Sequence, residues 1–79
     1  MDDKKIIELF FARDEAALDG VEKKYGALCR YIASKILVMR EDVEECVSDV
    51  LLALWNSIPP EDPQDFCAYL GKSVRNRAY

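Results

Sequence analysis

Residues 42–55 read Asp-Val-Glu-Glu-Cys-Val-Ser-Asp-Val-Leu-Leu-Ala-Leu-Trp, and this stretch decides the fold. Its apolar residues return every three or four positions, which is the spacing of one face of an α-helix. That face consists of Val43, Val47, Val50, Leu51, Leu54 and, just beyond the stretch, Ile58. Acidic residues open the stretch, where they complement the positive end of a helix dipole. We therefore expect a helix from Glu41 to about Ile58, with its apolar face in a core.

Upstream, the same spacing predicts a longer helix from about Glu15 to Leu37. Its apolar stripe consists of Leu18, Val21, Tyr25, Leu28, Ile32 and Ile36. Gly20 and Gly26 interrupt the stripe, and each disfavours a helix by roughly 1 kcal/mol relative to alanine, so we expect a bend or fraying there. A shorter apolar helix from Lys4 to Ala12 precedes it, and Asp14 is placed to cap the longer one.

Downstream, the segment Ile58-Pro-Pro-Glu-Asp-Pro63 cannot continue a helix, because proline lacks an amide hydrogen and restricts the residue before it. Asp65 can then cap a final helix that runs to Tyr79. No strand-like alternation occurs anywhere in the chain. The sequence therefore predicts an all-α domain, a compact bundle of about four helices around one core.

The charge of the chain is unevenly distributed. The net charge is −4 over 79 residues, which by itself argues against a nucleic-acid partner. Residues 64–79 nevertheless carry +2, because Lys72, Arg75 and Arg77 outnumber Asp65, and residues 1–63 carry −6. This segregation indicates two partners of opposite charge, and ordinary solvated surface is the alternative.

The sequence offers no groups for catalysis or for a cofactor. It has no histidine, and its three cysteines are too widely spaced for a zinc site, so we expect no enzyme, no metal and no cofactor. The unpaired cysteines indicate a reduced, cytoplasmic protein, and no stretch approaches the ~20 apolar residues of a membrane span. We expect Cys29 and Cys67 to pack as small core hydrophobes.

The helix at residues 41–58 has a second face that packing alone does not require. Leu52 and Trp55 project toward it, together with Glu45, Ser48 and Asp49. An exposed apolar centre with a polar rim is typical of a protein interface. The alternative is that Trp55 is simply buried under the first helix.

The last helix also separates two faces. Phe66, Leu70 and Val74 mark its buried stripe. The opposite side carries Lys72, Arg75, Asn76 and Tyr79. Cations bind phosphates, an amide can pair with base edges, and tyrosine offers a stacking plane, so this set suits single-stranded or opening DNA. A merely solvated face is the alternative, and Arg77 falls on the apolar side of this helix.

Four motifs in order resemble region 2 of sigma-70 transcription initiation factors of the extracytoplasmic-function (ECF) group. They are residues 12–18 (Ala-Arg-Asp-Glu-Ala-Ala-Leu), Tyr25-Gly26, residues 42–55, and residues 65–70 (Asp-Phe-Cys-Ala-Tyr-Leu) followed by Arg75-Asn76. The resemblance covers nearly the whole chain. It departs from the family where Ser48 replaces a usual Gln, Leu51 a Phe, and Tyr69 a Trp.

The resemblance implies a role for each of the two surplus faces. The family uses the segment resembling residues 42–55 to dock on the clamp helices of the largest subunit of RNA polymerase, which implies contacts by Glu45, Ser48, Asp49, Leu52 and Trp55. Its last helix captures the nontemplate strand of the promoter minus-ten element, which implies DNA contacts by Lys72, Arg75, Asn76 and Tyr79. The loop at residues 59–64 would help to hold a flipped base.

Two further expectations follow from the resemblance. A complete factor carries a second helical domain that reads the minus-thirty-five element, so residues 1–79 are expected to be a region 2-like fragment without that domain. The alternative function is a sigma-like protein-interaction module that does not bind DNA and is recognised by an anti-sigma factor. The net negative charge and Ser48 favour this alternative slightly.

Overall fold

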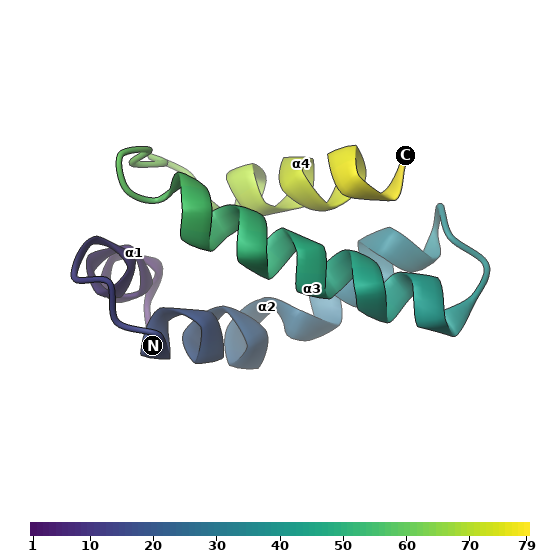
Figure 1. Cartoon of the computed structure of the whole chain (residues 1–79), viewed down its shortest axis with the longest axis horizontal. Helices are drawn as coiled ribbons and strands as arrows, with labels where there is room; N and C mark the ends of the chain where they lie inside the picture. Colours follow the sequence, from purple (N-terminus) through teal and green to yellow (C-terminus); the bar gives the residue numbers. More distant parts are fainter.

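The computed structural model describes all residues from 1 to 79 and contains four helices, as the sequence predicts (Figure 1). They are α1 (Asp3–Phe11), α2 (Ala16–Ser34), α3 (Arg40–Ser57) and α4 (Phe66–Ala78). The three longer helices run back and forth along the length of the molecule, while α1 is seen nearly end-on where α2 begins and α3 ends. No helix is both long enough and apolar enough to cross a membrane.

One core joins all four helices. Its largest fully buried side chains are Phe10, Phe66, Ile6, Leu54, Ile58, Leu70, Val21, Val50 and Val74. The predicted core face of α3 is confirmed, with Leu51 only partly buried at its edge. Cys46 is also buried on α3, where its thiol lies 3.8 Å from the Val74 carbonyl of α4. The packing of α3 against α4 therefore buries a residue that lies outside the predicted stripe.

α2 differs from its prediction in two respects. It is continuous from Ala16 to Ser34, so the expected fraying at the glycines is wrong. At Gly20 an added Cβ would come within 3.0 Å of the Met1 sulfur and 3.2 Å of Ile6, which shows that this glycine admits the N-terminal segment and α1. Leu28 is 36% exposed rather than part of the core stripe, because α2 turns its smaller residues, including Cys29, inward.

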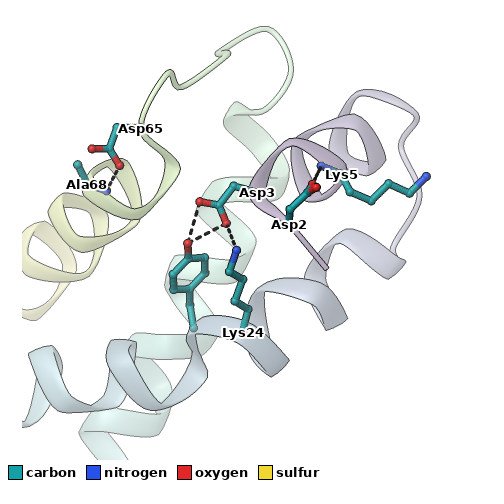
Figure 2. A network of polar contacts seen from close by, with 7 residues as sticks. Asp2, Asp3, Lys5, Lys24, Asp65 and Ala68 are labelled. Atoms are coloured by element: carbon teal, nitrogen blue, oxygen red, sulfur yellow. Dashed lines mark hydrogen bonds and ion pairs between the residues drawn. The ribbon is translucent and has the colours of Figure 1, made fainter.

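Polar contacts fix the helix starts and attach α1 to α2 (Figure 2). Asp2 accepts the Lys5 amide at 2.8 Å, and Asp65 accepts the Ala68 amide at 3.1 Å, so the predicted cap of the last helix is confirmed. Asp14 accepts the Ala16 amide at 2.9 Å at the start of α2. Each carboxylate satisfies an amide that has no partner within its helix.

Asp3 is the centre of the contact between α1 and α2. The Tyr25 hydroxyl donates to its two oxygens at 2.7 and 2.8 Å, and the Lys24 ammonium approaches at 2.8 Å. Burial would raise the pKa of Asp3, but the hydrogen bonds from Lys24 and Tyr25 and the charge of Lys24 outweigh it and lower this pKa. Tyr25 also packs on Phe66, with ring centroids 5.9 Å apart, so the network extends to the start of α4.

Candidate functional site

The outward face of α3 presents a continuous polar strip with one apolar residue at its centre. Glu45, Ser48, Asp49 and Leu52 are all exposed, and Leu52 has 59% of its surface accessible. Their spacing of three and four residues places them on one side of the helix, opposite the buried valines. The structure thus brings these four predicted residues together.

Trp55 does not share this exposure, and the prediction that it is an exposed residue is wrong. Its indole is only partly accessible and packs against Phe10 of α1, with ring centroids 6.4 Å apart. Arg13 lies on the turn between α1 and α2, and its guanidinium is 3.8 Å from the centroid of the indole. The alternative stated in the sequence analysis was that the first helix buries Trp55. The structure is closer to that alternative. Part of the Trp55 surface nevertheless remains accessible.

The acidic groups at the rim of this strip have no partner within the chain. The three ion pairs join Lys24 to Asp3, and Arg30 to Glu22 and Glu44. Glu44 is held by Arg30 at 2.8 and 3.1 Å, and the hydrogen bond from Arg30 lowers the pKa of Glu44. Glu45 and Asp49 take part in none of these pairs. Their charges are therefore available to a basic partner.

The predicted face of α4 is also assembled as expected. Lys72, Arg75, Asn76 and Tyr79 are exposed, and the phenol of Tyr79 lies at the chain end with 89% of the residue accessible. Phe66, Leu70 and Val74 are buried on the opposite side. Neither Lys72 nor Arg75 takes part in an ion pair. The face therefore offers two unpaired cations, an amide and an aromatic ring to a ligand.

Arg77 lies outside the core despite its place on the apolar side of the helical pattern. It is exposed and lines a groove of about 590 Å³ between α3 and α4. The other lining residues are Ala53, Asn56, Ser57, Tyr69, Ser73 and Asn76. A long arginine stem can carry its charged end from an apolar stripe to solvent, which accounts for the position. The groove extends the polar surface of α4 toward α3.

The loop between α3 and α4 borders a pocket of about 660 Å³. One wall is formed by Asp62, Pro63, Gln64, Asp65 and Phe66, and the other by Asp3, Lys4, Ile7, Glu8 and Phe11 of α1. The sequence placed only the loop at this site. No spacing in the sequence relates residues 3–11 to residues 62–66, so the contribution of α1 could be found only from the packing.

Arg13 is a second residue that the sequence did not single out. It has a positive φ of 55°, and its Nη1 donates to the Trp55 carbonyl at 2.7 Å and to the Ile58 carbonyl at 3.2 Å. The sequence placed it only just after the first predicted helix, within the motif at residues 12–18. Its partners lie 42 and 45 residues away, beyond the range of any helical pattern.

No group of three or more acidic or cysteine side chains is arranged to hold a metal ion. Burial raises the pKa of the Cys29 thiol to about 11, which keeps it protonated near neutral pH. Cys67 is exposed at the start of α4, so its predicted place in the core is wrong, because α4 turns Phe66 inward instead.

Comparison with known proteins finds a family model that matches most of the chain. Residues 23–79 match the family model described as Sigma-70 region 2. The match covers the larger part of α2, all of α3 and α4, and the loop between them, whereas α1 and Arg13 precede it. No curated protein and no solved structure was found to match the chain.

Proposed function

Since the chain belongs to the Sigma-70 region 2 family, whose non-enzymatic members act with RNA polymerase core and promoters in transcription initiation, we propose a specific role for each of its faces. The outer strip of α3 binds the clamp helices of the largest polymerase subunit. The outer face of α4, with the loop before it, binds the nontemplate strand of the minus-ten element. The chain acts as a factor of the ECF group.

The observation that carries this proposal is that α3 presents unpaired acidic side chains while the neighbouring α4 presents unpaired basic ones. The strip on α3 is acidic, with Leu52 at its centre, and the face on α4 is basic, with Tyr79 at its end. A protein interface with an apolar centre suits the first surface, and phosphate binding with base stacking suits the second. One molecule can therefore contact a protein and a nucleic acid at the same time.

The polymerase contacts that we propose are Glu45, Ser48, Asp49, Leu52 and Trp55. Leu52 supplies the apolar centre, since it is the large apolar residue of α3 that is most exposed. Glu45 and Asp49 supply charge, and Ser48 supplies a small polar contact. Trp55 contributes only the part of its surface that stays accessible beside Phe10 and Arg13.

The DNA contacts that we propose are Lys72, Arg75, Asn76 and Tyr79. The two cations bind backbone phosphates, Asn76 meets a base edge, and Tyr79 stacks on an unpaired base. Polymerase supplies most of the affinity and positions α4, which then traps an unstacked base and favours the open complex. Binding energy, without bond chemistry, opens the duplex.

The first experiment measures binding of the folded chain to a clamp-helix fragment of the polymerase, at one salt concentration. Leu52→Glu should abolish binding, because it places a charge in the apolar centre of the interface. Val38→Glu is the matched control, since Val38 is 96% exposed and lies in the connection between α2 and α3, outside the proposed contact strip. Absence of binding by the natural chain would contradict the proposal.

The alternative is an interaction module that is recognised by an anti-sigma factor and does not bind DNA. The net charge of −4 favours it, because an acidic chain is repelled by phosphates. Replacing Arg75 and Asn76 together by alanine separates the two proposals. Loss of promoter opening with polymerase binding retained supports the DNA role, whereas no effect on promoter opening supports the interaction module.

A further inference from the structure

We propose that Arg13 is a positioning residue that fixes the exit of the α3–α4 loop and thereby its capture of promoter DNA. The proposal deepens the function proposed above and rests on it. Arg13 lies on the turn between α1 and α2, ahead of the residues that match the family model. The turn and the loop lie at the same end of the molecule (Figure 1).

The backbone of Arg13 indicates that its side chain is needed where it lies. Its φ of 55° is in the left-handed region, which is unfavourable for a residue other than glycine. Glycine or asparagine would make the same turn more readily. The turn therefore carries an arginine at a conformational cost, and the contacts of its guanidinium offset that cost.

The first of these contacts closes the end of α3. The last carbonyls of a helix have no partner within it, and a cation there also complements the helix dipole. The last turn of α3 contains no basic residue of its own. Arg13 supplies the missing cation from a distant part of the chain, through its hydrogen bonds to the carbonyls of Trp55 and Ile58.

The second contact holds the indole of Trp55. The guanidinium of Arg13 lies 3.8 Å from the ring centroid, and Phe10 packs against the same ring at 6.4 Å. A cation over an indole is a favourable electrostatic contact. The ring is thus held from α1 and from the turn that follows α1. Trp55 links these two elements to the end of α3.

The position of Ile58 connects these contacts to the loop. Ile58 is the last residue before Pro59, so its carbonyl marks the point where the chain leaves α3. Within the loop, the Glu61 amide donates a hydrogen bond to the Ser57 carbonyl at 2.9 Å. At the far end of the loop, Asp65 accepts the Ala68 amide at the start of α4. Apart from Arg13, the near end is held by the hydrogen bond from the Ile58 amide to the Leu54 carbonyl and by burial of the Ile58 side chain, and neither of these engages the Ile58 carbonyl.

Arg13→Asn is the variant that tests the proposal, because asparagine accepts the left-handed backbone but cannot reach α3. Arg13→Gly is a second such variant, and Arg13→Lys keeps the charge but loses the planar group. Lys23→Asn is the matched control, since Lys23 is exposed on α2 and takes part in no ion pair. All variants are compared as the full chain, after circular dichroism has shown that they are folded.

Two readouts test the positioning without any partner. Trp55 is the single tryptophan, so quenching of its fluorescence by acrylamide reports on this contact directly. Arg13→Asn and Arg13→Gly should increase the quenching constant and speed hydrogen exchange at the Glu61 amide by about fivefold, the loss expected for one modest polar contact. Arg13→Lys should fall between them and the natural chain. Unchanged quenching and exchange would overturn the proposal.

A third readout tests the link to DNA. In the presence of polymerase, Arg13→Asn should weaken binding of the minus-ten nontemplate strand by about fivefold. The loss of affinity for the clamp helices should be smaller, because only one of the five proposed polymerase contacts, Trp55, touches Arg13. Unchanged strand affinity, or equal loss of both affinities, would overturn the positioning role in capture. If the natural chain does not bind the strand, the proposed function fails, and quenching and exchange still decide whether Arg13 positions the loop.

Discussion

The Tyr25 hydroxyl donates to both carboxylate oxygens of Asp3, at 2.7 and 2.8 Å, across the contact of α2 with α1. A hydrogen bond to a charged group contributes more than a neutral one, although this site is partly open to water. Tyr25→Phe should therefore lower the free energy of unfolding by about 1 kcal/mol in urea titrations. Tyr31→Phe is the control, since Tyr31 is exposed and its hydroxyl makes no such bond, and equal losses would contradict the prediction.

Acid should weaken the same network in a defined direction. The pKa of Asp3 is lowered from its ordinary 3.8, so the folded state favours the charged form. This contribution to stability is present above the unfolded pKa and is lost as pH falls through the folded value. The stability difference between the natural chain and Asp3→Asn should thus be constant near neutral pH and shrink below about pH 3.8. A difference that grows on acidification would contradict this.

Replacement by alanine should affect the stability of the chain very differently at two leucines of α3. Leu54 is fully buried, and its truncation should cost about 2–5 kcal/mol, because apolar burial is lost and a cavity forms. Leu52→Ala should change stability by less than about 0.5 kcal/mol, since Leu52 is exposed. Thermal unfolding of both variants measures the contrast. Comparable losses would show that the outer strip is part of the core.

The start of α4 should depend on the carboxylate of Asp65. Its side chain accepts the Ala68 amide at 3.1 Å, and removal of such a cap costs about 1 kcal/mol. Asp65→Ala should lower the free energy of unfolding by this amount and increase amide exchange in the first turn of α4. Asp62→Ala, in the exposed part of the same loop, is the control and should have little effect.

Salt should reveal whether the cations of α4 bind phosphates. Each phosphate contact to a single strand contributes about 0.7 to the slope of log affinity against log salt concentration. Lys72→Ala and Arg75→Ala should each reduce this slope by about that amount in complexes with polymerase and minus-ten strand. Lys23→Ala should leave it unchanged. Unaltered slopes in the α4 variants would exclude phosphate contacts by these residues.

The helices were predictable because their signals are local. The apolar spacing in residues 42–55 fixed both the helix and its buried face, and the prolines at 59–63 fixed the loop. The cap by Asp65 depends on a residue three positions away. The outer strip of α3 and the cationic face of α4 followed from the same periodicity, since a helix that buries one side exposes the other.

Only the tertiary structure decided how much of each side chain on these helices is exposed to solvent. Trp55 lies on the outer side of the helical pattern, but Arg13 and Phe10 cover much of its ring. Cys67 borders a buried stripe and is exposed, while Cys46 is buried against α4. These outcomes depend on which helix lies beside which, and helical periodicity carries no information about neighbours.

The sequence by itself thus determined four helices, their inward faces and the two charged surfaces, because each depends on residues within a few positions of one another. The packing decided that α1 forms a wall of the loop pocket and that Arg13 closes the end of α3. Such contacts join residues more than forty positions apart. They exist only after burial of the common core has brought those segments together.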